Sequence, residues 1–121
     1  ASDVYKRQFK NHPNNPNIRN ARIEVLNKNH ISCRHLPNEW FIADEWYNYY
    51  NINPNISVLL NLDESSYEGG ENGGNHPIAW YHEYAGGRAF YTGGGHTKES
   101  FAEPDFVQHL LGGILYCLKK D

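Results

Sequence analysis

His96 is the residue of this sequence best placed for chemistry. It follows a predicted strand, Arg88 to Thr92, and a triple glycine that ends at Gly95. We therefore expect its side chain at the carboxyl end of a sheet, where open α/β folds bind ligands. A neutral imidazole there could be a general base or a metal ligand, because its reference pKa of about 6.5 lies near physiological pH. A histidine that only holds the loop in shape is the alternative interpretation.

Asp44 and Glu45 are adjacent carboxylates that could assist this histidine. Neighbours in an extended segment point to opposite faces, so only one of them can face the site, and they cannot share a proton. Asp63 follows a predicted central strand, although acidic residues next to serines are also ordinary turn chemistry. The aromatic neighbours Trp46 and Tyr47 could stack on sugar rings, although packing is the commoner use of such side chains.

The seven histidines raise the question of a zinc site. The best candidates are His76, His82 and His96, with an aspartate or glutamate as a further ligand. Their spacing matches neither HExxH nor the Cys/His patterns that indicate zinc strongly. We therefore expect no cofactor, with zinc as the alternative. His82 falls within a predicted strand and His109 on the last predicted helix, where ordinary sheet packing and a solvated position are expected.

The hydrophobic pattern predicts a half-buried strand early in the chain and a central strand in its middle. Apolar and charged residues alternate over 21–26, with the period of two that is typical of a strand with one face in the core. The run over 56–62 is apolar almost throughout, so both of its faces should be covered, normally by helices. Further strands are predicted over 40–43, 78–84 and 88–92, the last two joined as a hairpin.

One helix is predicted, over 104–119. Pro104 suits its first turn, and Glu103 and Asp105 favour its positive end. Its apolar residues recur at helical spacing and predict a single apolar stripe, formed by Phe106, Val107, Leu110, Leu111, Ile114, Leu115 and Leu118. One helix cannot cover both faces of such a sheet, so further helices are expected upstream.

Length and charge limit the classes of partner. The 121 residues are enough for one domain. The formal net charge is -3 and no basic stripe is present, so nucleic acids and anionic membranes are not expected as partners. The longest apolar run, Leu110 to Leu118, contains two glycines and is shorter than the roughly 20 residues of a transmembrane helix. Cys33 and Cys117 allow at most one disulfide and form no CxxC motif.

Several motifs together resemble the ThuA-like family, which is named for trehalose utilisation. They are His76-Pro77-Ile78-Ala79-Trp80, the stretch from Gly86 to Thr97, and Phe106 to Gly113. Upstream they continue through His12-Pro13, His35-Leu36-Pro37, Asp44-Glu45-Trp46-Tyr47 and Leu62 to Ser65. The resemblance implies a flavodoxin-like α/β three-layer sandwich similar to class I glutamine amidotransferases. This chain would be its C-terminal half, and the missing N-terminal half would be its partner and supply the missing helices.

The resemblance also implies a role in carbohydrate metabolism, with trehalose, another disaccharide or a keto-sugar as the substrate class. His96 stands where the amidotransferase triad has its histidine, but a glutamate follows two residues later there, whereas Lys98 precedes Glu99 here. The family's Asp-Glu-aromatic-Tyr motif favours Glu45 and Tyr47 as substrate ligands or partners of a histidine. The nucleophilic cysteine of the amidotransferases is generally absent from the family, so glutaminase activity is not implied.

The expected function is sugar binding at the carboxyl end of the sheet, with His96 and Glu45 as catalytic residues and Tyr47, Asp63 and Trp46 as substrate contacts. The alternative is a noncatalytic carbohydrate-binding or scaffolding module of a larger extracellular protein. The resemblance favours a periplasmic or extracellular location and leaves a cytoplasmic one open.

The start of the chain has a separate interpretation. Asp3 to Gln8 reads as the translation of a DNA end that resembles the transposon sequence used in preparing sequencing libraries. We expect residues 1–8 to be such an adapter and to be disordered, with an ordinary polar N-terminal tail as the alternative. The C-terminal part of the ThuA-like domain is then expected to span 9–121. The segment 11–20 has two prolines among five asparagines and is predicted to be a loop.

Overall fold

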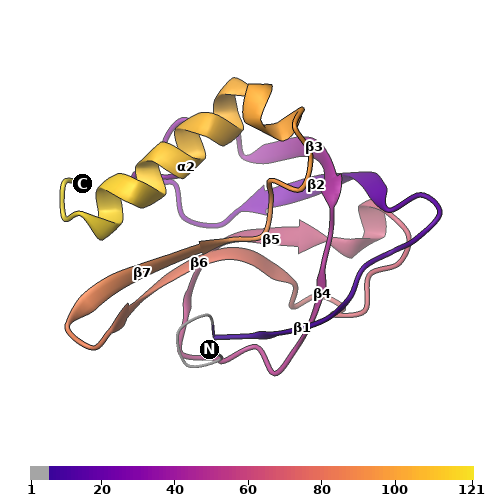
Figure 1. The fold of residues 1–121 in the computed structure, drawn as a ribbon, viewed down its shortest axis with the longest axis horizontal. Helices are drawn as coiled ribbons and strands as arrows, with labels where there is room; N and C mark the ends of the chain where they lie inside the picture. Colours follow the sequence, from indigo (N-terminus) through magenta and orange to yellow (C-terminus); the bar gives the residue numbers. More distant parts are fainter. Residues whose placement is uncertain (1–5) are drawn as a thin grey trace.

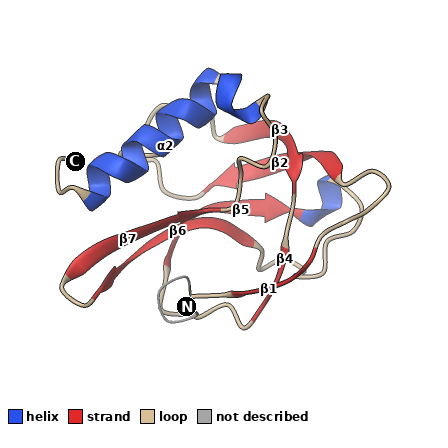
Figure 2. Ribbon diagram, in the orientation of Figure 1, coloured by secondary structure: helices blue, strands red, loops and turns tan. Residues whose placement is uncertain are grey.

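The computed structural model describes residues 6–121. Each predicted strand and the predicted helix has a counterpart in it (Figures 1 and 2). In chain order the elements are β1 (Gln8–Asn11), β2 (Ile18–Val25), β3 (Glu39–Glu45), β4 (Asn48–Tyr50), β5 (Ser57–Asp63), the 3-10 turn η1 (Glu64–Ser66), β6 (Pro77–Tyr84), β7 (Gly87–Thr92), the 3-10 turn η2 (Ser100–Ala102) and α2 (Pro104–Cys117).

The main sheet has five strands in the order β3-β2-β5-β6-β7. β5 lies in the middle, which confirms the predicted central strand. β6 and β7 pair antiparallel from Ala79↔Thr92 to Tyr84↔Gly87, which confirms the predicted hairpin. Its two turn residues, Ala85 and Gly86, both have positive φ, 51° and 81°, as a tight hairpin turn requires.

Every strand pair in residues 6–121 is antiparallel, and the result is a curled antiparallel sheet with one α-helix packed on it (Figure 2). The described chain is therefore of mixed α/β class but does not itself form the expected flavodoxin-like sandwich, which needs parallel strands with helices on both faces. The connections are consistent with this arrangement. The two-residue turn between β6 and β7 can join only antiparallel strands, and the connections from β2 to β3 and from β5 to β6 contain no α-helix that could serve as a parallel crossover.

The face of the sheet opposite α2 is covered by a ribbon rather than by helices. β1 and β4 pair antiparallel, and Figure 1 shows them on the far side of the sheet from α2. Tyr49 of β4 packs edge-on against Trp80 of β6, whose indole stacks on Tyr91 with ring centroids 4.2 Å apart. The expected cover of the central strands thus comes from an unpredicted element.

Strand structure also extends further toward the start of the chain than predicted. β2 begins at Ile18, inside the predicted loop 11–20, because residues 18–20 pair with the end of β3. Residues 1–5, with most of the predicted adapter, lie outside the described residues. Gln8 was expected to be disordered but begins β1 and pairs with Tyr50. The origin of the first eight residues stays a prediction.

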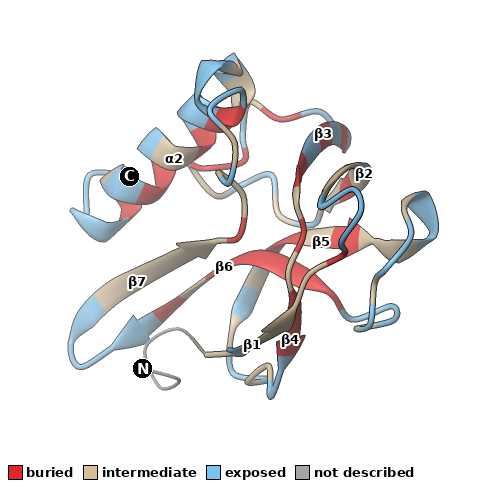
Figure 3. Ribbon diagram, turned by 45° about the vertical axis from the view of Figure 1, so that its right-hand side comes forward, coloured by how far each residue is buried: buried red, intermediate tan, exposed pale blue. Residues whose placement is uncertain are grey.

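Helix α2 packs on the sheet with a different face from the predicted one (Figure 3). Its buried residues are Phe106, His109, Gly112, Gly113 and Tyr116. Gly112 is needed there, since a Cβ atom on it would lie 2.5 Å from the Ser32 Cα atom. Most of the predicted stripe faces outward, because Val107, Leu111, Ile114 and Leu118 are between 45% and 60% exposed. Spacings of four, three and four residues place these four side chains on one side of the helix.

His109 is fully buried, against the expectation of a solvated position. Its Nδ1 donates to the Ser32 carbonyl oxygen, and its Nε2 accepts from Thr92 Oγ1, both at 3.0 Å. These two bonds make a histidine acceptable at the core-facing side of α2. Within residues 6–121, no helix is long and apolar enough to cross a membrane.

Candidate functional site

The candidate site is organised by Asp44, near the end of β3. Its side chain is fully buried. Asp44 Oδ2 accepts hydrogen bonds from the Gly95 backbone N–H at 2.7 Å and from Ser100 Oγ at 3.1 Å. Oδ1 accepts from the backbone N–H groups of Glu45 at 2.8 Å and His96 at 3.0 Å. One carboxylate therefore anchors the loop that follows β7 to the end of β3.

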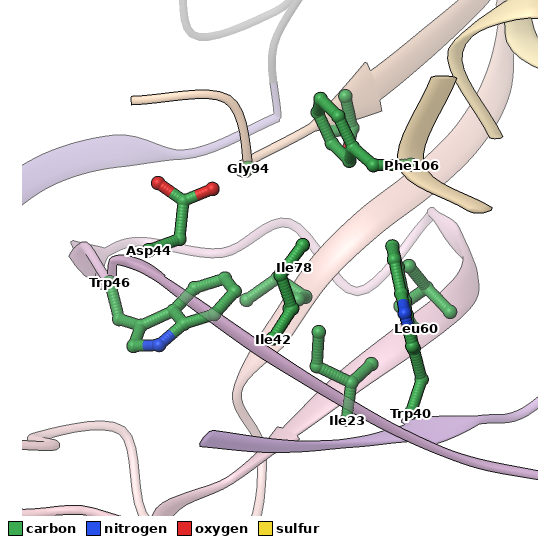
Figure 4. A pocket seen from close by; sticks show the side chains of 10 residues that line it. Ile23, Trp40, Ile42, Asp44, Trp46, Leu60, Ile78, Gly94 and Phe106 are labelled. Atoms are coloured by element: carbon green, nitrogen blue, oxygen red, sulfur yellow. The ribbon is translucent and has the colours of Figure 1, made fainter. Parts of the chain in front are cut away.

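The triple glycine lets this loop pass directly over Asp44. A Cβ atom on Gly94 would lie 2.9 Å from Phe106 Cε1 and 3.4 Å from Asp44 Oδ2, and Gly95 has a φ of +95°. The contacts at Gly94 leave no room for a side chain, and glycine adopts the positive φ of Gly95 without steric cost. Figure 4 shows the Asp44 carboxylate beside the Gly94 segment, with Phe106 on its other side.

The space on the inner side of Asp44 is closed. A cavity of only about 10 Å³ lies there among Ile42, Trp46, Phe106 and other core residues (Figure 4). That volume holds at most one water molecule. A ligand of this site therefore has to approach from the side of His96.

Asp44 is a carboxylate at neutral pH. Burial by itself raises the pKa of this group, but hydrogen bonds from His96, Gly95 and Glu45 outweigh burial and hold the pKa below its ordinary value of 3.8. The site therefore contains a fixed negative charge that is stabilised by directed N–H and O–H donors.

His96 is oriented by this charge. Its Nδ1 lies 3.2 Å from Asp44 Oδ1 and carries the proton of that bond, since an ionised carboxylate can only accept. In the neutral ring, Nε2 then holds the lone pair. Among residues 6–121 no hydrogen-bond partner of Nε2 is found, and the side chain is 24% exposed. A histidine held by a carboxylate at one nitrogen and open at the other is arranged for proton transfer.

Tyr47 forms one wall of the site. Its ring packs against His96 with centroids 4.4 Å apart and edge-on against Phe9 at 4.6 Å. Burial first, and then the nearby Glu45 carboxylate, raise the pKa of the Tyr47 hydroxyl, so the phenol keeps its proton at neutral pH and can donate a hydrogen bond.

His76 holds Tyr47 from behind. This fully buried histidine contacts the Tyr47 carbonyl oxygen through Nε2 at 2.8 Å and Glu64 Oε2 through Nδ1 at 2.6 Å. Because both partners are acceptors, the two bonds exist together only when a proton sits on each nitrogen or when Glu64 carries one. Neither nitrogen of His76 is free for a metal or a substrate.

The other predicted site residues have different surroundings. Glu45 accepts from Asn17 Nδ2 at 2.6 Å, and the acid partner of His96 is Asp44 instead. Trp46 is buried and donates through Nε1 to the Arg19 carbonyl oxygen at 2.7 Å, which leaves its ring no free face for a sugar. It therefore serves the core.

Asp63 also has a structural role. It caps the 3-10 turn η1 by accepting from the Ser65 N–H at 3.0 Å, and it pairs with Arg22 Nη1 at 3.0 Å. The bonds from Ser65 and then from Arg22 lower the pKa of Asp63. None of these contacts involves His96 or Tyr47.

The three histidines considered as zinc ligands do not form a cluster. His76 is engaged as described, and His82 lies largely buried in β6. Within the described part of the chain, no group of three or more His, Cys, Asp or Glu side chains is placed to hold a metal ion.

The sequence contained a signal for Asp44 that the prediction missed. Trp40, Ile42 and Asp44 are the buried residues of β3 and alternate with exposed ones. The predicted strand ended at residue 43, one residue short of continuing this alternation to the carboxylate. If the predicted strand is extended by that one residue, the period of two places Asp44, rather than Glu45, on the core-facing side toward His96.

Solved structures similar to this chain share its fold. A ThuA-like protein from Bacteroides uniformis ATCC 8492 matches with a TM-score of 0.77 and 25% identity over 99% of this chain and 51% of its own. A ThuA-like protein from Parabacteroides merdae ATCC 43184 matches with a TM-score of 0.66 and 22% identity over 90% of this chain and 41% of its own. The chain thus spans about half the length of the first of these proteins.

No curated protein matches the chain significantly. A family model does match it: the model of the ThuA family, described as trehalose utilisation, covers residues 2–117. This match covers nearly the whole chain, and we conclude that the chain belongs to the ThuA family.

Proposed function

We propose that this chain is the C-terminal half of a ThuA-like domain of carbohydrate metabolism, in which His96 acts as a general acid/base on a bound sugar. Trehalose, another disaccharide or a keto-sugar is the substrate class suggested by the family. The observation that carries the catalytic part is the pair of Asp44 and His96, with Nδ1 of the imidazole 3.2 Å from a buried carboxylate.

The chemistry follows from this pair. His96 Nε2 can remove a proton from a sugar hydroxyl or return one to a leaving oxygen. When the ring becomes charged, Asp44 stabilises the imidazolium through the Nδ1 bond without itself taking the proton. A positioned general acid/base of this kind contributes about 10²–10⁴-fold to a rate. The proposal requires no cofactor.

The test uses the full-length product of the gene, assayed with trehalose and with keto-disaccharides. We expect His96→Gln to lower kcat by about 10²–10⁴-fold. His30→Gln is the control, because His30 packs against Tyr81 and Tyr116 near the other end of α2. Turnover that survives in His96→Gln would overturn the catalytic role. Binding without any turnover would support the noncatalytic module, and stoichiometric zinc in the preparation would contradict the absence of a cofactor.

The outward face of α2 supports the proposal of a half domain. Monomeric proteins rarely leave a continuous apolar stripe exposed, yet this helix exposes Val107, Leu111, Ile114 and Leu118. Beside this stripe lies an apolar groove of about 530 Å³ between α2 and β7. The Bacteroides protein has about as much chain again beyond the matched part. We propose that this second half covers the stripe and groove and completes an amidotransferase-like sandwich.

A charge on the stripe tests this packing. In the full-length product, Leu111→Glu is expected to lower the free energy of unfolding by about 2–3 kcal/mol, since it would bury an unpaired carboxylate. Gln108→Glu on the exposed surface of the same helix is the matched control, with a change within about 0.5 kcal/mol. Equal effects of the two substitutions would contradict the covered stripe, and so would a gene that encodes no further domain half upstream.

A further inference from the structure

His12 lies beside the candidate site although it is far from His96 in the sequence. It follows β1, and the antiparallel pairing of Asn11 with Asn48 brings it next to Tyr47. The imidazole of His12 stacks on the Tyr47 ring with centroids 5.9 Å apart and planes 22° apart. The His96 ring contacts the same tyrosine. Tyr47 is thus a ring that both histidines share.

Each of these histidines faces one of the two adjacent carboxylates. Glu45 Oε1 lies 3.8 Å from His12 Nε2, while Asp44 Oδ1 lies 3.2 Å from His96 Nδ1. Alternation along β3 sends the two carboxylates to opposite faces of the strand. The two adjacent carboxylates therefore lie near two different imidazoles, Asp44 near His96 and Glu45 near His12.

The orientation of His12 leaves one of its nitrogens available. Nδ1 donates to the Pro13 carbonyl oxygen at 2.8 Å, which fixes the ring and leaves the Nε2 lone pair in the neutral form. The 3.8 Å between Nε2 and Glu45 is too long for a hydrogen bond. Glu45 itself is held by Asn17 Nδ2 at 2.6 Å, and the His12 side chain is 29% exposed. A ligand hydroxyl group can therefore donate a hydrogen bond to Nε2.

We propose that His12 is a second ligand-binding residue of this site and that its Nε2 accepts a hydrogen bond from a hydroxyl group of the sugar on which His96 acts. This inference rests on the proposed function. A sugar presents several oxygen atoms at fixed separations, so two imidazoles on one tyrosine ring, each with an available Nε2, suit a polyhydroxylated ligand.

Histidine NMR signals separate this inference from the proposed function. In the full-length gene product, addition of trehalose is expected to shift the Cε1–Hε1 signals of both His12 and His96, while the signal of His30 stays in place. A shift of His96 without His12 would overturn the inference and leave the proposed function intact. Absence of a shift at both histidines, with trehalose and with keto-disaccharides alike, would overturn both.

A pair of substitutions distinguishes ligand binding from a merely structural role. His12→Asn keeps a donor near the Nδ1 position for the Pro13 carbonyl but removes Nε2, whereas His12→Gln keeps a polar atom near the Nε2 position. We expect His12→Asn to raise the Kd for trehalose by about tenfold, as for one lost hydrogen bond, and His12→Gln to raise it less. The reverse order would indicate that only the Pro13 bond matters. That order, or wild-type affinity in both variants, would overturn the inference.

Discussion

His109 and His96 lie in two neighbouring regions of the molecule that use the same side chain differently. On α2, His109 is fully buried, and its two nitrogens are taken up by Ser32 and Thr92. In the loop after β7, His96 is partly exposed and uses Nδ1 alone, on a buried carboxylate. Burial therefore does not identify a histidine that can do chemistry. A nitrogen that the fold orients but leaves without a partner does.

The protonation chemistry of the two regions differs accordingly. Burial lowers the pKa of His109 to about 4, so this imidazole is neutral at physiological pH. On the other side, hydrogen bonds lower the pKa of Asp44 despite its burial, so a charge is retained there. The imidazole of His109 in the α2 region is thus uncharged, whereas the loop region contains the charged carboxylate of Asp44, which contacts His96.

Removal of the retained charge should have the largest effect. Both carboxylate oxygens of Asp44 accept hydrogen bonds from backbone and side-chain donors. In Asp44→Asn one of these oxygens is replaced by an amide nitrogen, which cannot accept, so the donors on that side lose their partner. We expect the free energy of unfolding to fall by about 4 kcal/mol, measured by urea denaturation. Glu45→Gln, at the more exposed neighbouring position of the same strand end, should cost less than about 1 kcal/mol. Similar losses in both variants would remove the distinction between the two carboxylates.

The buried His109 on α2 should make the stability of the protein depend on pH. The unfolded chain protonates His109 near pH 6.5, whereas the folded protein does so only near pH 4. Between these values the unfolded state binds more protons, so stability should fall by about 3 kcal/mol as the pH is lowered from 6.5 to 4. His109→Gln should flatten this slope, as measured by urea denaturation at each pH. An unchanged slope in the variant would contradict the assignment.

A further loss at lower pH should come from Asp44. Its folded-state pKa lies below the unfolded value of 3.8, so its contribution is present above that pH and disappears as the pH falls through the folded pKa. The loss below pH 4 should therefore persist in His109→Gln, and only the loss above pH 4 should depend on His109.

His76 tests whether a histidine with two engaged nitrogens is always structural. His76→Gln removes the ring that joins Glu64 to the Tyr47 carbonyl, and we expect a loss of about 2 kcal/mol in the free energy of unfolding. The His96 NMR signal should move as well, because Tyr47 packs on that ring. Unchanged stability would show that the two bonds of His76 are dispensable, unlike those of His109.

His96 itself should contribute least to stability. Its backbone N–H bond to Asp44 is retained in His96→Gln, and only the Nδ1 bond is lost. We expect a change of less than about 1 kcal/mol in urea denaturation, together with the large loss of turnover proposed above. A destabilisation as large as that of a His109 substitution would place His96 among the structural histidines.

Local patterns predicted much of the fold and one residue of the site. Periodicity located β2, β3, β5, β6, β7 and α2, and the triple glycine before His96 indicated a residue exposed at the end of a strand. The same patterns failed for α2, where leucines and an isoleucine suggested the buried face. Gly112 and Gly113 occupy that face instead, because they allow Ser32 and Phe90 to approach the helix closely. The packed face of α2 is the one whose small residues let neighbouring segments come close to the helix. A hydrophobicity pattern identifies large apolar side chains and so cannot identify such a face.

Residue order and composition alone therefore predicted the main-sheet strands, the hairpin and the helix. They also showed the resemblance to the ThuA family and made His96 the leading candidate for a catalytic residue. Tertiary structure decided that Asp44 rather than Glu45 contacts His96, and that His12 joins Tyr47 and Glu45. The reason is the separation of these partners along the chain, 52 residues between Asp44 and His96. Contacts at that range depend on how β3, the β1–β4 ribbon and the loop after β7 meet in space, and local periodicity carries no information about that meeting.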